Sequence, residues 1–334
     1  MSKSLIRGSF SALKWLLCGI GAVAVLITAL VAAPVAQPPE LRSVSETARA
    51  VDRSTMPRFE LFQARDGTEL AYRHYPGRSA SVGRVAIVVH GSSGSSPSVH
   101  ALADALAARG VETYAVDMRG HGASGTRGDI RYVGQLEDDL VDFVAVVRKT
   151  NPTAPLTLLG HSSGGGFALR VAGSPIQSLF ARMVLLAPYL GYEAPSSRQD
   201  AGGWASVDIP RILALQALRK VGIDCCEGLP TLAFAVPSDS AKILVPAYTE
   251  RLRRNFGTRG YRIDLAAATR PLTIFSGADD ELMIADKYAE AVSGITPAVD
   301  VKLIDGINHM GIISTPRAVS AIADDVATRG TAGT

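Results

Sequence analysis

Apolar residues in the body of this chain gather in six short continuous runs instead of alternating with polar residues. Continuous runs are typical of parallel strands whose two faces are both covered. Most of the intervening segments carry apolar residues at helical spacing. This alternation predicts a doubly wound α/β fold. We expect strands at residues 85–89, 113–116, 156–159, 183–186, 272–275 and 299–304, and helices at 99–109, 136–149, 164–172, 284–292 and 316–328.

Two regions differ from this βα rhythm. Residues 59–75 alternate around the turn dipeptide Asp66-Gly67, which predicts an antiparallel hairpin. Residues 191–269 contain no apolar run as convincing as the others, and a structureless loop of that length is improbable in a compact domain. We therefore expect a mostly helical lid there, with helical stretches such as 209–221 and 241–256.

The first part of the chain predicts a membrane helix. Residues 15–33 are nineteen uncharged, mostly apolar residues, and roughly 20 such residues span a bilayer. Lys3, Arg7 and Lys14 precede the span, so the positive-inside rule leaves the N-terminus cytosolic and the folded body on the other, non-cytosolic side, which is periplasmic in a bacterium. A cleaved signal peptide is the alternative, but its apolar region is usually only about 7–15 residues long. The span length favours an uncleaved anchor.

These boundaries give five segments. We expect an anchor at 1–36, a polar linker at 37–57 with room for one short helix, and a lid at 191–269. The lid divides the α/β core into residues 58–190 and 270–334.

Composition fits an exported globular enzyme. The 334 residues are 47% hydrophobic and 19% charged, which excludes disorder. Three of the 34 basic residues precede the first acidic residue, Glu40, so the remainder carries 31 basic and 31 acidic residues. A neutral body gives no reason to expect a nucleic-acid partner.

The three cysteines do not form a disulfide framework. Cys18 lies in the predicted membrane span, and Cys225 and Cys226 are adjacent. We interpret the adjacent pair as two small residues of a helical subdomain, with a strained vicinal disulfide as the alternative. The histidines are scattered and no ligand-spaced Cys/His cluster occurs, so we predict no metal site and no cofactor.

The chemistry begins at the third predicted βα unit. Gly160-His161-Ser162-Ser163-Gly164 matches G-x-S-x-G, the nucleophile elbow. A serine at the apex of a tight strand-to-helix turn needs neighbours without bulky side chains two residues away on either side. The apolar run before the motif and the helical pattern after it are the context that the motif requires. Ser162 is therefore the candidate nucleophile.

A serine nucleophile needs a base and an acid that orients the base. In α/β-hydrolases the order along the chain is Ser, Asp or Glu, then His. Past the elbow the chain contains one histidine, His309, just after the last predicted strand. The acid should follow the preceding strand, where Asp279, Asp280 and Glu281 leave the choice open, and we interpret the two that are not the acid as solvated. Asp305 is close to His309 and is interpreted as capping a turn.

The oxyanion hole needs two backbone N–H donors. One donor should follow the nucleophile, at Ser163. The other should come from the turn after the first central strand, residues 90–94, where we select Ser92.

Together these motifs resemble the monoglyceride lipase, lysophospholipase and serine aminopeptidase-like branch of the α/β-hydrolases. The resemblance rests on His90-Gly91, on Asp117-Met118-Arg119-Gly120-His121-Gly122-Ala123-Ser124, on the elbow and on Gly277-x-x-Asp280. It implies an α/β-hydrolase fold from about residue 59 to residue 328, with Asp280 as the acid. It also implies that 117–124 is a buried structural turn, so that Arg119 and His121 have no catalytic role. The chain departs from the pattern at Ser163, where many relatives carry Met, and in the lid.

The leading hypothesis is a membrane-tethered serine hydrolase that cleaves carboxylic esters, such as monoacylglycerols or lysophospholipids, through an acyl-enzyme. Peptide or amide cleavage is an alternative, but the acidic residues of the lid form no cluster that would bind a substrate amine. A catalytically inactive hydrolase-fold binding module is a second alternative, although such proteins usually lack a triad residue and none is missing here. The expected partners are a small ester or lipid substrate and the membrane.

Overall fold

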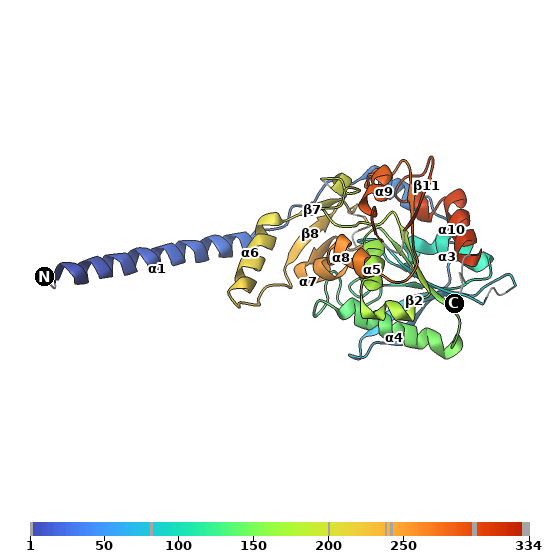
Figure 1. Cartoon of the computed structure of the whole chain (residues 1–334), viewed down its shortest axis with the longest axis horizontal. Helices are drawn as coiled ribbons and strands as arrows, with labels where there is room; N and C mark the ends of the chain where they lie inside the picture. The colour runs from blue at the N-terminus through green and yellow to red at the C-terminus, as the bar shows by residue number, and fades with distance from the viewer. Residues whose placement is uncertain are drawn as a thin grey trace.

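The computed structural model describes residues 3–80, 83–199, 201–237, 239–240, 243–295 and 299–328, with side chains from residue 14 onward. A long N-terminal helix projects from a folded body (Figure 1). Asp200, residues 241–242 of the predicted lid helix and the end of the last segment, 329–334, lie outside the described residues.

The core is an eight-stranded sheet that confirms the predicted α/β-hydrolase fold. All six apolar runs are strands and pair in parallel, whereas the predicted hairpin adds two antiparallel strands at one edge. In sheet order the strands are β1 (Phe59–Gln63), β2 (Glu69–Tyr75), β4 (Glu112–Val116), β3 (Val85–Val89), β5 (Leu156–His161), β6 (Arg182–Leu186), β10 (Leu272–Gly277) and β11 (Asp300–Ile304).

Helices cover both faces of the sheet, which explains why the strand runs are continuously apolar. In β3, Val85, Ile87 and Val89 face one hydrophobic cluster, and Ala86 and Val88 face the other. The second cluster includes α3 (His100–Ala108) and α10 (Pro316–Thr328). The first includes α4 (Gln135–Thr150), α5 (Ser163–Ala172), α8 (Tyr261–Ala267) and α9 (Tyr288–Ala291). The helix predicted at 284–292 is shorter than expected, because Ala285–Lys287 is a 3-10 turn.

The insertion at 191–269 is not as helical as predicted. It contains a small antiparallel sheet of β7 (Ala205–Val207), β8 (Pro230–Phe234) and β9 (Ala247–Thr249), beside α6 (Ile209–Lys220) and α7 (Glu250–Asn255). The prediction of a helix over 241–256 is therefore wrong for residues 243–249. β7 and β9 have three residues each, too few to form a distinct apolar run, whereas residues 232–236, which begin in β8, are a continuous apolar run that indicates a strand. The helix predicted at 209–221 is confirmed as α6.

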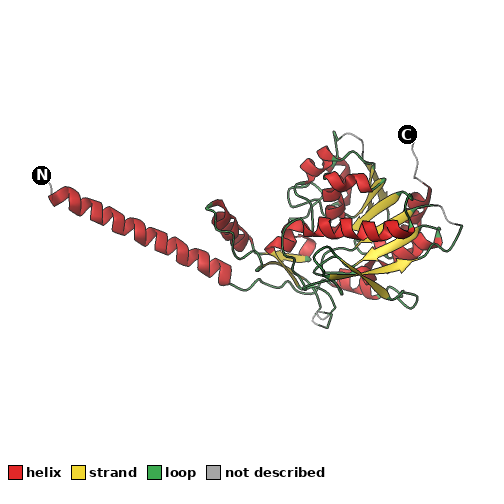
Figure 2. Ribbon diagram, turned by 90° about the horizontal axis from the view of Figure 1, so that it is seen from below, coloured by secondary structure: helices red, strands yellow, loops and turns green. Residues whose placement is uncertain are grey.

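The N-terminal helix α1 spans Lys3–Ala32. Its segment Lys14–Ala32 is long and apolar enough to cross a membrane, and none of that segment is buried. The end of α1 lies beside α6, where Arg211 Nε donates to Leu30 O at 3.4 Å (Figures 1 and 2). The following linker contains one short helix, α2 (Arg42–Arg49).

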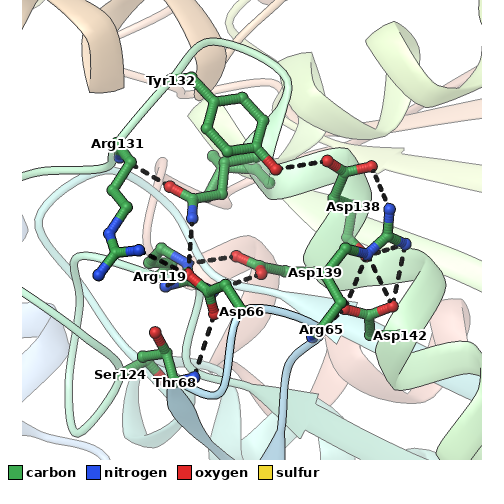
Figure 3. A network of polar contacts seen from close by, with 12 residues as sticks. Arg65, Asp66, Thr68, Arg119, Ser124, Arg131, Tyr132, Asp138, Asp139 and Asp142 are labelled. Atoms are coloured by element: carbon green, nitrogen blue, oxygen red, sulfur yellow. Dashed lines mark hydrogen bonds and ion pairs between the residues drawn. The ribbon is translucent and has the colours of Figure 1, made fainter.

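A buried ion-pair network joins the edge hairpin to α4 (Figure 3). The Arg119 guanidinium donates to Asp139 at 2.7 and 2.8 Å and to Asp66 at 3.1 Å. At the protein surface Arg65 makes a second set of bonds to Asp142. The network fixes the turn that contains Arg119 against the hairpin and α4, and this placement supports the structural interpretation of residues 117–124.

Candidate active site

Ser162 occupies a strained turn between β5 and α5. Its backbone has φ 53° and ψ −119°, a region that non-glycine residues rarely adopt. A Cβ atom at Gly160 would lie 2.1 Å from the carbonyl oxygen of Gly164, and one at Gly164 would lie 2.3 Å from the carbonyl oxygen of His90. Both glycines of the motif are therefore required by close backbone packing. This geometry is that of a nucleophile elbow.

His309 and Asp280 form a buried pair on the loops after β11 and β10. His309 Nδ1 lies 2.8 Å from Asp280 Oδ2, and the two side chains are almost completely buried. The other oxygen, Asp280 Oδ1, accepts the backbone N–H groups of Leu282 and Met283, both at 2.8 Å. Burial alone would raise the pKa of Asp280, but the charge and hydrogen bond of His309 and the two backbone bonds together lower it below its usual value. Asp280 is thus an ionised acceptor for His309.

Ser162 and His309 line the same cavity. His309 O also accepts a hydrogen bond from His161 Nε2, the neighbour of Ser162, at 3.1 Å. Among the described contacts, no hydrogen bond joins Ser162 Oγ to the His309 imidazole. Such bonds in ligand-free enzymes are often long and shorten only when substrate binds. Ser162, Asp280 and His309 each follow the carboxyl end of a parallel strand, so the three predicted residues lie at the same edge of the sheet.

The same region of the chain matches a known family. Residues 80–313, more than half of the chain, match the family model described as serine aminopeptidase, S33. The chain belongs to this family.

Relatives of this S33-family protein include lipases. It is 33% identical over 105 residues to a monoacylglycerol lipase of Mycolicibacterium smegmatis, a segment that covers 31% of this chain and 37% of that lipase. Its fold is similar to that of a soluble variant of the Saccharomyces cerevisiae monoglyceride lipase, with a TM-score of 0.58 and 18% identity over 82% of this chain and 95% of that one. A bacterial membrane phospholipase A matches at TM-score 0.55 and 16% identity, over 96% of this chain and 99% of that one. These structural matches show the fold alone.

The oxyanion candidates of this S33-family chain differ in what surrounds them. Ser163 is the first residue of α5, so its N–H points out of the helix end. Ser92 lines the cavity, and its hydroxyl accepts from Trp204 Nε1 at 2.8 Å. The neighbouring Ser93 N–H donates to the hydroxyl of Tyr248 at 2.7 Å. Within the described part of the chain the N–H groups of Ser92 and Ser163 donate to no protein acceptor, so both are available to an oxyanion.

Glu281 is a positioning residue that the sequence did not reveal. We interpreted the neighbours of Asp280 as solvated, and this is wrong for Glu281, because its Oε2 accepts the backbone N–H of His309 at 2.9 Å while Oε1 is buried. Asp279 is exposed, as expected. Asp305 is exposed as well. No local sequence signal indicates the role of Glu281, because its partner is 28 residues away.

His161 is the second such residue. Its ring packs 4.7 Å from the His309 ring, centroid to centroid, in addition to its bond to His309 O. Burial, followed by the nearby His309, lowers the pKa of His161 to about 3. His161 is therefore neutral and acts as a hydrogen-bond donor that supports the His309 loop.

The motif residues outside the triad have structural partners. Asp117 accepts the backbone N–H groups of Ser96 at 2.7 Å and Ala123 at 3.0 Å, which links the turn to the loop after β3. His121 Nε2 lies 2.5 Å from Tyr248 Oη, and burial holds the pKa of His121 well below its ordinary value. These contacts agree with the absence of catalytic roles for Arg119 and His121.

The remaining candidates for chemistry lie away from the cavity. Cys225 and Cys226 are exposed free thiols with their sulfur atoms 2.7 Å apart. They lie in the loop between α6 and β8 of the inserted lid. Among the described residues no group of three or more His, Cys, Asp or Glu side chains is arranged to hold a metal.

Proposed function

We propose that this S33-family protein is a membrane-tethered serine hydrolase that cleaves carboxylic esters of the monoacylglycerol or lysophospholipid type. The observation that carries the proposal is the strained Ser162 sharing one cavity with a histidine that is held by a buried carboxylate. The relative named monoacylglycerol lipase supports the ester class.

The proposed reaction uses the triad in two steps. Ser162 Oγ attacks the ester carbonyl while His309 Nε2 takes its proton, and Asp280 stabilises the imidazolium through Nδ1–H. The Ser92 and Ser163 N–H groups donate to the oxyanion of the tetrahedral intermediate. Its collapse releases the alcohol, which receives the proton from His309, and leaves an acyl-enzyme. Water activated by His309 then attacks the acyl-enzyme and releases the carboxylic acid.

The cavity lining favours an ester over a substrate with a free amine. Its walls are mainly apolar, formed by Val44, Trp204, Leu244, Leu282 and Met310. No Asp or Glu occurs among the described lining residues, whereas a charged substrate amine that is buried in the site needs an opposite charge beside it. An apolar wall instead suits an acyl chain.

Hydrolysis of p-nitrophenyl esters tests this proposal. We expect the wild type to hydrolyse them and to react with a fluorophosphonate probe, and Ser162→Ala to lose both. Removal of a serine nucleophile lowers kcat by about 10⁶-fold in the best-studied case. Equal rates for wild type and variant, or labelling at another residue, would refute the assignment. An intact fold with neither activity nor labelling would favour the binding-module alternative.

The tether needs a separate experiment. We expect the full chain to remain in the membrane fraction after an alkaline carbonate wash, with its N-terminal peptide intact by mass spectrometry. Protease added on the non-cytosolic side of the membrane should digest the folded domain. A mature protein that begins near residue 34 and is released by the wash would show that the helix is a cleaved signal peptide.

A further inference from the structure

The linker that follows the apolar helix contributes to the active-site cavity. Val44, Ser45 and Ala48 of α2 line the cavity together with Ser162 and His309. Val44 and Ser45 are buried, and Val44 belongs to the main hydrophobic cluster. A linker that only spaced an anchor from a domain would stay solvated. The polar linker of the sequence is therefore part of the site.

Contacts from three directions hold α2 in this position. Asn308, next to His309, donates through Nδ2 to Thr47 Oγ1 at 3.0 Å. Arg53, just after α2, donates to Pro97 O at 3.2 Å and back to Ala48 O at 2.8 Å. Arg49 forms an exposed ion pair at 3.4 Å with Asp239 of the lid. The helix is thus fixed between the His309 loop, the loop after β3 and the lid.

The wall of the cavity that α2 forms, with Val44, Ser45 and Ala48, lies outside the part of the chain that matches the family. The family match begins at residue 80, about thirty residues after the end of α2. The properties of the shared domain therefore do not determine this wall. Leu244 and Leu282 contribute further apolar surface to the same cavity, from the lid and from the loop after β10.

The cavity is small for a lipid substrate. It encloses about 80 Å³, whereas ligand pockets commonly measure about 300–1,000 Å³. A long acyl chain can enter only where the side chains of one wall move aside. The size of those side chains then determines the acyl length that fits. Of the α2 residues that line the cavity, Val44 and Ala48 are apolar and lie one helical turn apart, so both face the same space.

We propose that α2 is the specificity wall of the acyl site, and that Val44 and Ala48 determine the acyl length that the enzyme accepts. The inference rests on the proposed ester hydrolysis. A larger side chain at Ala48 shortens the acyl group that fits, and a smaller one at Val44 admits a longer group.

The test is a chain-length profile of the full-length protein in detergent. kcat/KM is measured for p-nitrophenyl esters from acetate to palmitate in the wild type, Ala48→Phe, Val44→Ala and Ala50→Phe. Ala50 is the exposed residue that caps the C-terminal end of α2, so Ala50→Phe is the matched control. Melting curves establish that each variant is folded.

We expect Ala48→Phe to lower kcat/KM for long esters at least about tenfold relative to acetate, the size of effect that one or two methylenes produce in an apolar pocket. Val44→Ala should move the optimum toward longer chains, and Ala50→Phe should retain the wild-type profile. Folded Ala48→Phe and Val44→Ala with the wild-type profile would overturn the inference while leaving ester hydrolysis intact. A wild type that hydrolyses none of the esters would instead contradict the proposed function.

Discussion

At the scale of single residues, the site depends on backbone packing as much as on the triad side chains. Ser162 retains its strained conformation because Gly160 and Gly164 allow backbone atoms to approach closely around it. Asp280 and Glu281 both hold His309, one through the ring and the other through the backbone. Adjacent acids in one loop therefore have different functions.

The three adjacent acids give a direct test of this division. Asp280→Asn should lower kcat by about 10³–10⁴-fold, because an amide no longer fixes the histidine tautomer or stabilises the imidazolium. Glu281→Gln should lower kcat by roughly tenfold at most, because its amide oxygen can still accept from the His309 N–H. Asp279→Asn, at an exposed position, should remain within about twofold of wild type. Steady-state kinetics measures all three. A larger loss of kcat for Glu281→Gln than for Asp280→Asn would show that Glu281, and not Asp280, is the acid on which His309 depends.

At the scale of elements, buried polar contacts position the loops around the cavity. Arg119 connects the turn after β4 to the edge hairpin and to α4 (Figure 3). Asp139 is buried beside it, and burial raises the pKa of Asp139 despite the hydrogen bonds and charge of Arg119. The pair therefore connects elements that are remote in the sequence.

Removal of one partner should leave the other buried charge unpaired and lower the free energy of unfolding. Arg119→Met should lower the free energy of unfolding by about 3–5 kcal/mol, because Asp139 would remain buried without its partner. Arg78→Met removes an arginine from a half-exposed pair with Asp104 and should cost less than about 1 kcal/mol. Urea denaturation of the two variants gives the comparison. Similar losses for both would show that the network adds no special stability.

At the scale of the whole molecule, three fully buried histidines make folding depend on pH. Burial is the main cause that lowers the pKa of His90, His121 and His161. The unfolded chain binds protons at these side chains below about pH 6.5, whereas the folded chain binds them only at lower pH. The folded state therefore loses stability as the pH falls through that value.

Urea denaturation from pH 7.5 to pH 5 checks the sign and size of this effect. The free energy of unfolding should fall with decreasing pH by up to about 1.4 kcal/mol per pH unit for each histidine. His161→Gln, whose amide can still donate to His309 O, should reduce that slope by the contribution of one group. Stability that stays constant or increases on acidification would show that these histidines are protonated in the folded state.

The sequence by itself determined the features that depend on local pattern. Continuous apolar runs predicted the six parallel strands, because strands covered on both faces have no solvent side. The turn at Asp66-Gly67 predicted the hairpin, and the elbow motif predicted the strained serine, because each is specified by neighbouring residues. The length of the apolar segment predicted α1 as the candidate membrane span.

Only the tertiary structure decided what depends on contacts between distant segments. Two of the three strands in the insertion have only three residues each and left no distinct run in the sequence, so the lid was predicted to be too helical. The family pattern had implied Asp280 as the acid, but the bond from Glu281 to the His309 N–H depends on where the His309 loop lies, about thirty residues later. The burial of α2 in the cavity depends on residues near 97, 239 and 308, and no local pattern in a polar linker records such partners.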